Sequence, residues 1–226
     1  MPERIIKSTD RVKDIGEVFT PKRTVKLMLD QPEITEKIND LNATFLEPAA
    51  GEGAFLVELL KRRLDVAKKQ SKGAAEMQNN FLLALSTLYG IELMEDNMEM
   101  LVMNMSNTFQ HIYYHTFNMH DQDIKVVKSA NVIISANMAQ GNALTYKTNT
   151  DDPIIFSEWK PLHNGRVKRT EYTFESIIKG GADTGTVQSN YEQLDLFADP
   201  EEQTAFKEEK EYLPCKWKDI YKRKVK

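Results

Sequence analysis

The sequence contains a single cysteine, Cys215, among its 226 residues. One cysteine cannot form a disulfide within the chain or supply a cysteine-based zinc site, so a reducing compartment is expected. No apolar run approaches the length of a membrane span, and the first residues do not resemble a secretory signal. These absences predict a cytoplasmic protein and exclude the disulfide-rich secreted class.

The chain also lacks an excess of basic residues. Lys and Arg number 30 against 34 Asp and Glu, which gives a formal net charge of −4. A protein that binds nucleic acid alone usually carries a basic excess, because neutralising phosphates supplies most of the affinity. The charge balance therefore argues against a chain that grips DNA by itself. With 41% hydrophobic residues, the composition is that of a globular protein with a sizeable core.

Residue patterns divide the chain into three parts. Residues 1–40 are polar and contain a helix, for which Thr20 is expected as N-cap and Pro21 as the first helical residue. Residues 41–150 alternate strands with helices, which predicts an α/β core with a parallel sheet. Residues 151–226 have too little apolar periodicity for a second full domain and are expected to form a less regular extension that contacts a partner.

Within the central part, a buried strand is expected at 44–47 and a second strand at 89–93. Apolar residues at helical spacing over 55–64 predict the intervening helix, and the polar segment 68–80 is interpreted as an extended loop. Residues 124–134 are ambiguous between helix and strand, although the helical period fits three of their apolar positions.

A glycine-containing turn follows the first strand and opens the next helix. Gly51 and Gly53 allow a sharp turn and close approach of a ligand, to which the N–H groups of the new helix are presented. Leu56 stands where the dinucleotide fingerprint would have its third glycine. Glu47 at the strand end would repel a pyrophosphate but would favour a ligand that carries an ammonium or sulfonium group. A plain strand–helix turn is the alternative interpretation.

Three further features suggest a nucleoside ligand. Glu92 ends the second strand, where an acid typically accepts hydrogen bonds from both ribose hydroxyls. Asn142, next to Gly141, offers a donor and an acceptor to an adenine edge, although an ordinary turn explains the pair equally well. Capping explains Thr20 but leaves the aromatic Phe19 unexplained.

Taken together, segments 16–21, 46–53, 90–93 and 141–144 resemble, in this order, the cofactor-binding motifs of bacterial adenine-N6 DNA methyltransferases of restriction–modification type. The resemblance implies a doubly wound, Rossmann-like class I methyltransferase domain that binds S-adenosyl-L-methionine. It further implies that the methionine moiety, the ribose and the adenine of the cofactor are contacted by Phe19, Thr20, Pro21, Glu47, Pro48, Ala49, Gly51, Gly53, Glu92, Leu93, Asn142 and Ala143.

The sequence departs from that family at the catalytic motif. Adenine-N6 methyltransferases carry Asn/Asp-Pro-Pro-Tyr/Phe, which binds the target amine and stacks on the flipped base. This sequence has no Pro-Pro dipeptide, and Asp152-Pro153-Ile154-Ile155 lacks both the second proline and the aromatic ring. No catalytic residue is therefore assigned to this chain. Residues 153–159 resemble a stretch of short methylase-like subunits whose partner chain carries the missing motif.

The resemblance thus predicts the cofactor-binding subunit of a split methyltransferase, encoded by a bacterium or phage, with double-stranded DNA as the substrate of the complex. His111, His115 and His120 lack the nearby ligands of a standard metal site, so no metal is expected. Two alternatives remain open: a self-sufficient methyltransferase acting on a substrate other than DNA, and a non-catalytic module that binds S-adenosylmethionine. A nicotinamide-dependent dehydrogenase is disfavoured by the missing third glycine.

Overall fold

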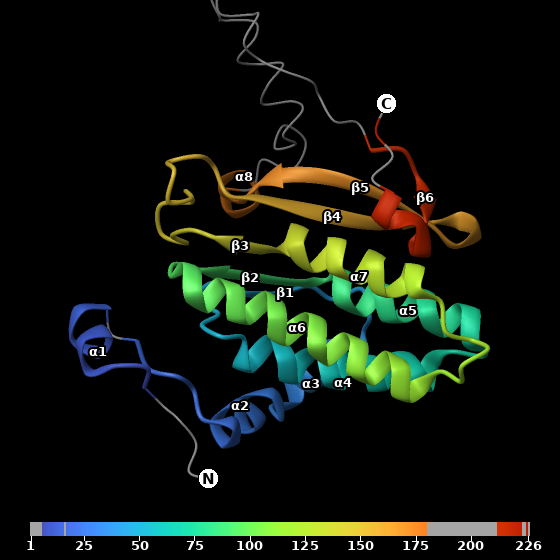
Figure 1. The fold of residues 1–226 in the computed structure, drawn as a ribbon, viewed down its shortest axis with the longest axis horizontal. Coiled ribbons are helices and arrows are strands. Elements are labelled where there is room, and N and C mark those ends of the chain that lie inside the picture. The colour runs from blue at the N-terminus through green and yellow to red at the C-terminus, as the bar shows by residue number, and fades with distance from the viewer. Residues whose placement is uncertain (1–5, 16, 180–211, 223–224, 226) are drawn as a thin grey trace, which may run out of the picture.

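The computed structural model describes residues 6–15, 17–179, 212–222 and 225 (Figure 1). Its centre is a parallel sheet of three strands in the order β1-β2-β3, formed by Phe45–Glu47, Leu88–Glu92 and Met138–Gln140. In the register, Glu47 lies opposite Gly90, and Glu92 lies opposite Gln140. The carboxyl ends of the strands therefore meet at one edge of the sheet, as expected for a parallel α/β core.

Two helices make each crossover between neighbouring strands. The first crossover consists of α4 (Ala54–Gln70) and α5 (Ala74–Ser86), and the second of α6 (Glu95–Thr116) and α7 (Ile124–Asn137). Helices α4 and α6 cover one face of the sheet, since a Cβ at Gly90 would lie 2.8 Å from a Leu56 methyl of α4 and 3.4 Å from a Leu101 methyl of α6. The helical alternative for residues 124–134 is the one observed.

The predicted loop over residues 68–80 is wrong. Helix α4 continues to Gln70 and α5 begins at Ala74, so only residues 71–73 connect them. The polar residues of this segment occupy the outer faces of two amphipathic helices, whose inner faces carry buried residues such as Ala67 and Phe81.

The predicted buried strand at 44–47 is present as β1, but it is not fully buried. Leu46 is 41% exposed, because β1 pairs with β2 alone among the described strands and forms the edge of the sheet. The described strands also follow one another in sequence order. The reversal of strand order that defines a doubly wound sheet is therefore not among them.

The N-terminal part contains α1 (Thr9–Ile15), α2 (Lys22–Leu29) and α3 (Pro32–Asn39) rather than one helix. The predicted capping of α2 is wrong by one position. Pro21 is the N-cap residue, and no side chain caps the helix, so Thr20 does not serve as the cap.

The C-terminal part is more regular than its sequence suggests. Strands β4 (Ile155–Leu162) and β5 (Arg166–Thr173) form an antiparallel hairpin, joined by the short helix η1 (His163–Gly165). Helix α8 (Phe174–Lys179), strand β6 (Cys215–Lys216) and helix η2 (Trp217–Lys222) complete it. The expectation of a less regular extension is therefore wrong for these residues. The glycine-rich loop and the acidic segment expected between 180 and 211 lie outside the described residues.

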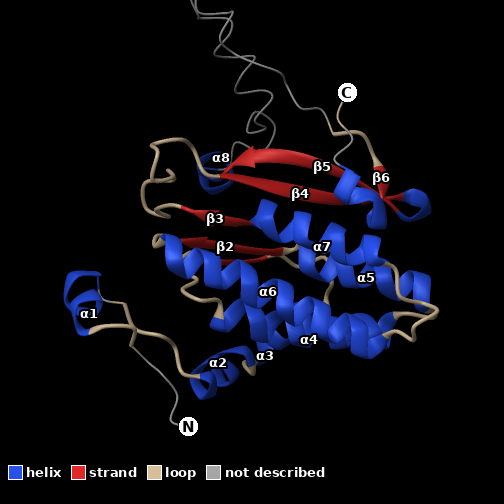
Figure 2. Cartoon of the chain, viewed as in Figure 1, coloured by secondary structure: helices blue, strands red, loops and turns tan. Residues whose placement is uncertain are grey.

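This C-terminal sheet shares the main hydrophobic core. Trp159 of β4 donates a hydrogen bond from Nε1 to Oδ1 of the buried Asn137 at 3.0 Å, and Trp217 and Ile220 of η2 are buried in the same cluster. Figure 2 shows the two sheets beside each other, with β3 next to β4, and α7 packs against η2. Within the described ranges, no helix has both the length and the apolar character needed to cross a membrane.

A fully buried arginine joins α4 to the segment that leads into β1. The Arg63 guanidinium lies 5.2 Å from the Phe45 ring centroid and donates to Thr87 Oγ1 at 2.7 Å. It also donates to four backbone carbonyls, those of Lys37, Asp40, Leu41 and Ala84. Burial lowers the pKa of Arg63 to about 10, so the group stays charged at neutral pH.

Replacing Arg63 by Met should destabilise the fold severely, because the carbonyls that now accept from the guanidinium would stay buried without donors. We expect the unfolding free energy, measured by urea denaturation, to fall by about 3 kcal/mol or more. Arg62→Met is the matched control: Arg62 neighbours Arg63 on α4 but makes only surface ion pairs with Asp30 and Glu58. Its loss should cost less than about 1 kcal/mol. Equal effects of the two substitutions would contradict this role of Arg63.

Candidate cofactor site

The turn after β1 is built around two glycines in the left-handed region. Gly51 has φ of +55° and Gly53 has φ of +90°, values that side-chain-bearing residues rarely adopt. A Cβ at Gly53 would lie 2.5 Å from Leu101 Cδ1, so α6 also excludes a side chain there. A Cβ at Gly51 would lie 3.8 Å from the Phe19 ring. The structure therefore brings Phe19 from the N-terminal segment against the glycine turn.

Glu92 connects this turn to the start of α6. Its Oε2 accepts a hydrogen bond from the Gly51 N–H at 2.7 Å, and its Oε1 accepts from the Met94 N–H at 3.0 Å and from Asn97 Nδ2 at 3.3 Å. A carboxylate offers about four lone-pair positions. Three are used by the protein, which leaves one position on Oε2 for a further donor.

Glu47, at the carboxyl end of β1, has an unusual environment for an acidic side chain. Its Oε2 is buried and has no hydrogen-bond partner among the described residues. Burial raises the pKa of Glu47 to about 8, and the charge of Glu92 adds to the effect, while the backbone amide of Leu56 opposes it. Ionising a buried carboxyl group that has an unpartnered oxygen is costly, and a cation placed beside it would remove that cost.

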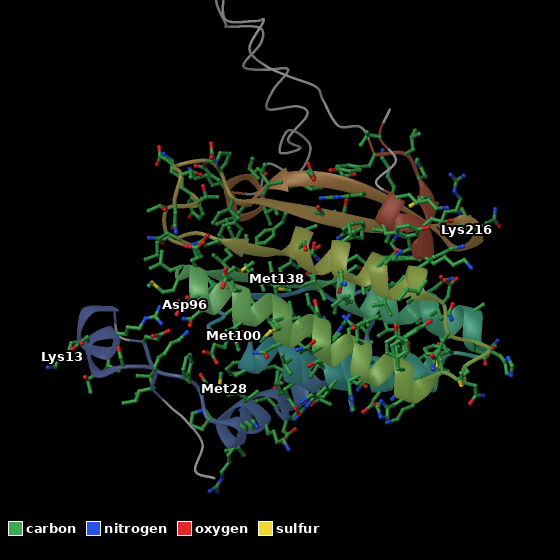
Figure 3. The ribbon with its side chains drawn as sticks, viewed as in Figure 1. Lys13, Met28, Asp96, Met100, Met138 and Lys216 are labelled. Carbon is green, nitrogen blue, oxygen red and sulfur yellow. The ribbon has the colours of Figure 1, made fainter. Side chains whose placement is uncertain are left out.

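The N-terminal segment is held to this region by ion pairs. Arg11 binds Asp96 with two hydrogen bonds of 2.9 and 2.7 Å, and Lys7 approaches Asp96 to 2.7 Å and Glu52 to 3.4 Å. Arg11 also pairs with Glu17 at 3.2 Å. These cations hold the pKa of Asp96 well below its usual range. Figure 3 labels Asp96 at the start of α6, on the side that faces α1.

Asn97 is the residue of this site that sequence reasoning missed. It is buried, donates from Nδ2 to both Glu92 and Glu17, and accepts at Oδ1 from Lys7 Nζ at 2.9 Å. It thereby couples the acid of β2 to the N-terminal segment. The partners from that segment precede Asn97 by 80 and 90 residues, and no local motif indicates such contacts.

The loop after β3 has a structural explanation of its own. Asn142 Oδ1 accepts from the Leu144 N–H at 2.9 Å, and the Asn142 N–H donates to the Lys147 carbonyl at 2.8 Å. A Cβ at Gly141 would lie 2.6 Å from that same carbonyl oxygen and 2.7 Å from Ile154 Cδ1. Gly141 therefore permits the close approach of its own loop.

The other sequence-predicted residues differ in how far the fold buries them. Thr20, Pro21 and Ala143 are half-buried, whereas Pro48, Ala49 and Leu93 are exposed. Leu93 is 43% exposed directly after Glu92, which leaves an apolar surface at this edge of the sheet.

Residues 152–155 cannot act as a base-binding motif. Ile154 is fully buried in a small core with Ile91, Phe156 and Phe174. Its N–H donates to the Tyr146 carbonyl at 2.9 Å, and its carbonyl accepts from the Phe174 N–H at 2.7 Å. The backbone of this segment is thus committed to connecting β3 with β4.

A parallel α/β sheet with acids at the ends of adjacent strands and a glycine turn between them is consistent with a methyltransferase-like fold. The chain matches the family model N-6 DNA Methylase over residues 3–186 and belongs to that family. Membership indicates a DNA methyltransferase, and N-6 DNA methylases generally use S-adenosylmethionine. No curated protein and no solved structure matches this chain.

The raised pKa of Glu47 should make the cofactor-free protein less stable as pH rises. Glu47 is protonated in the folded state up to about pH 8 but ionises near 4.5 when unfolded. Between these two pH values the free energy of unfolding therefore falls as pH rises, by up to about 1.4 kcal/mol per pH unit from this group. In urea denaturation at pH 5 to 8, the free energy of unfolding of Glu47→Gln should not show this decline with pH.

Glu36→Gln on α3 is the matched control, because it removes an exposed carboxyl group outside β1 and the glycine turn. It should keep the decline of the wild-type protein. Parallel stability curves for the wild type and Glu47→Gln would contradict the assignment of a raised pKa to Glu47.

Proposed function

We propose that this chain is the S-adenosylmethionine-binding subunit of a heteromeric adenine-N6 DNA methyltransferase of restriction–modification type. The observation that carries the proposal is the buried Glu47 carboxylate at the end of β1, whose Oε2 has no partner among the described residues. It lies next to a glycine turn whose own N–H groups are partly committed to Glu92. This arrangement suits a ligand that presents a cation to Glu47 rather than a phosphate to the turn.

The residues fit the parts of S-adenosylmethionine, which supplies a methyl group activated by a sulfonium. Glu47 would pair with the amino group of the methionine moiety, and Phe19 would cover that moiety from the side of Gly51. Glu92 has capacity for one ribose hydroxyl, and Leu93 provides apolar surface for the adenine. Asn142 retains its Nδ2 hydrogens, since the turn uses its Oδ1.

Two observations support a requirement for a second chain. The segment 152–155 is the one whose sequence comes closest to a catalytic tetrapeptide. It forms a buried connection between β3 and β4. The described strands of the parallel sheet also lie in sequence order from β1 to β3, so none of them lies beyond β1. A partner that carries Asn/Asp-Pro-Pro-aromatic would accept the hydrogens of the adenine amine and stack on the flipped base, while this chain orients the methyl donor.

Calorimetric titration with S-adenosylmethionine at a fixed pH of 8.5 should show binding by the isolated chain. Glu47→Gln should weaken the affinity by roughly 10- to 100-fold, since a charge-assisted interaction with the amino group is lost. Glu92→Gln should weaken it by at least about tenfold, because both the turn and the ribose contact depend on its carboxylate. Glu36→Gln should bind like the wild type. No binding by the wild type would contradict the proposed cofactor.

A methylation assay with tritiated cofactor and unmodified DNA should show no activity for this chain alone. Activity should emerge when it is mixed with the methylase chain encoded beside it that carries the Pro-Pro-aromatic motif. Robust methylation of DNA by the single chain would overturn the split-enzyme proposal. Methylation of RNA or protein without a partner would favour a self-sufficient enzyme, and cofactor binding without catalysis by the mixture would favour a regulatory module.

A further inference from the structure

The outer edge of β1 is open for pairing. Strand β1 pairs with β2 alone among the described strands. The Phe45 N–H donates to the Thr87 carbonyl at 2.9 Å, on the β2 side. Because successive residues of a strand direct their backbone groups to opposite sides, the N–H and C=O of Leu46 point away from β2. No described residue forms a hydrogen bond with them.

An apolar hollow adjoins this edge. It has a volume of about 430 Å³ and lies between β1, the start of β4 and helix α8. Leu46 is 41% exposed and shares a face of the sheet with Tyr89, its partner in the register, which packs against Phe156 with ring centroids 5.3 Å apart. Ile177 of α8 also lines the hollow and is 51% exposed.

The later strands that the structure describes do not fill this position. Strand β4 pairs with β5, and Figure 1, in which β1 is labelled, shows the pair on the β3 side of the parallel sheet. The Tyr89 hydroxyl donates to the Ser157 carbonyl at 2.9 Å, which fixes β4 in that place. An open strand edge next to exposed apolar side chains is a template for a strand from another chain.

We propose that the outer edge of β1 and the hollow beside it are where the catalytic partner docks, by adding a strand parallel to β1 and an apolar side chain into the hollow. The inference rests on the proposed function and deepens it. In open α/β sheets, ligands bind where the strand order reverses, beside the first strand. Glu47 lies at the carboxyl end of β1, so only a parallel strand there would end beside the residues proposed to hold the cofactor.

A second copy of this chain fits the edge less well. Two copies related by a twofold axis would pair their β1 strands in opposite directions. The two carboxyl ends, and with them the two Glu47 residues, would then lie at opposite ends of the pairing. Such a contact completes neither site, whereas a parallel strand from the partner would bring its base-binding motif to the cofactor.

The test substitutes Leu46→Lys, which places a charge in the hollow while Glu47 and Glu92 stay intact. Binding of the Pro-Pro-aromatic methylase chain, measured by biolayer interferometry, should weaken by at least about tenfold. Met119→Lys is the matched control, because Met119 is 87% exposed in the connection between α6 and α7, away from the hollow. Calorimetric titration of S-adenosylmethionine should give the same affinity for Met119→Lys, for Ile177→Lys on α8 and for the wild type.

Ile177→Lys on α8 provides a second variant that leaves β1 itself unchanged, in case Leu46→Lys impairs folding. It should weaken partner binding in the same direction. Hydrogen exchange of the wild-type chain should show new protection at residues 44–47 when the partner is added.

The outcomes separate this inference from the proposed function. Partner binding that is unchanged in both variants, without protection at 44–47, would overturn the docking site but leave the split enzyme in place. Loss of self-association alone would assign the edge to a second copy and would also overturn it. Failure of the wild type to bind the partner or the cofactor would overturn the proposed function itself.

Discussion

The hydrogen bond from the Gly51 N–H to the Glu92 carboxylate is the contact on which the rest of the site depends. It joins the turn after β1 to the end of β2, and Glu92 passes the connection through Asn97 to Glu17 and the N-terminal segment. One buried carboxylate thus brings together three stretches of chain far apart in sequence. Because its Oε1 is saturated by Met94 and Asn97, Glu92 orders the protein first and has limited capacity for a ligand. Glu47, by contrast, has an oxygen that accepts no hydrogen bond from the described residues. It is therefore the acidic group of the site that a cation would stabilise most.

The sequence predicts those parts of the molecule that local patterns determine. Strand ends at Glu47 and Glu92 and the glycine turn between them follow from residues within a few positions, and the structure places them together. Asn97 was missed because its importance comes from contacts with Lys7 and Glu17, which no periodicity encodes.

Polar side chains on the outer faces of helices and strands explain the errors in the predicted fold. Residues 68–80 were interpreted as a loop because their polar side chains dominate the composition, although these side chains occupy the solvent faces of helices. The β4–β5 hairpin was similarly hidden by charges on its outer face, where Lys160 stands opposite Lys168, while Trp159 and Val167 turn inward to the core. The fold also explains Gly141, since a side chain there would collide with the Lys147 carbonyl of its own loop. Burial, rather than composition, decides each of these cases.

Glu47 is proposed to receive the amino group of the cofactor at its unsatisfied oxygen, and the number of protons released on binding reports on this pairing. At pH 7 a group with a pKa of about 8 is mostly protonated, so pairing with the amino group must expel its proton. Calorimetric titration of S-adenosylmethionine in two buffers of different ionisation enthalpy counts the protons released. The account predicts close to one proton for the wild type and a value near zero for Glu47→Gln. Equal proton counts for the two proteins would contradict it.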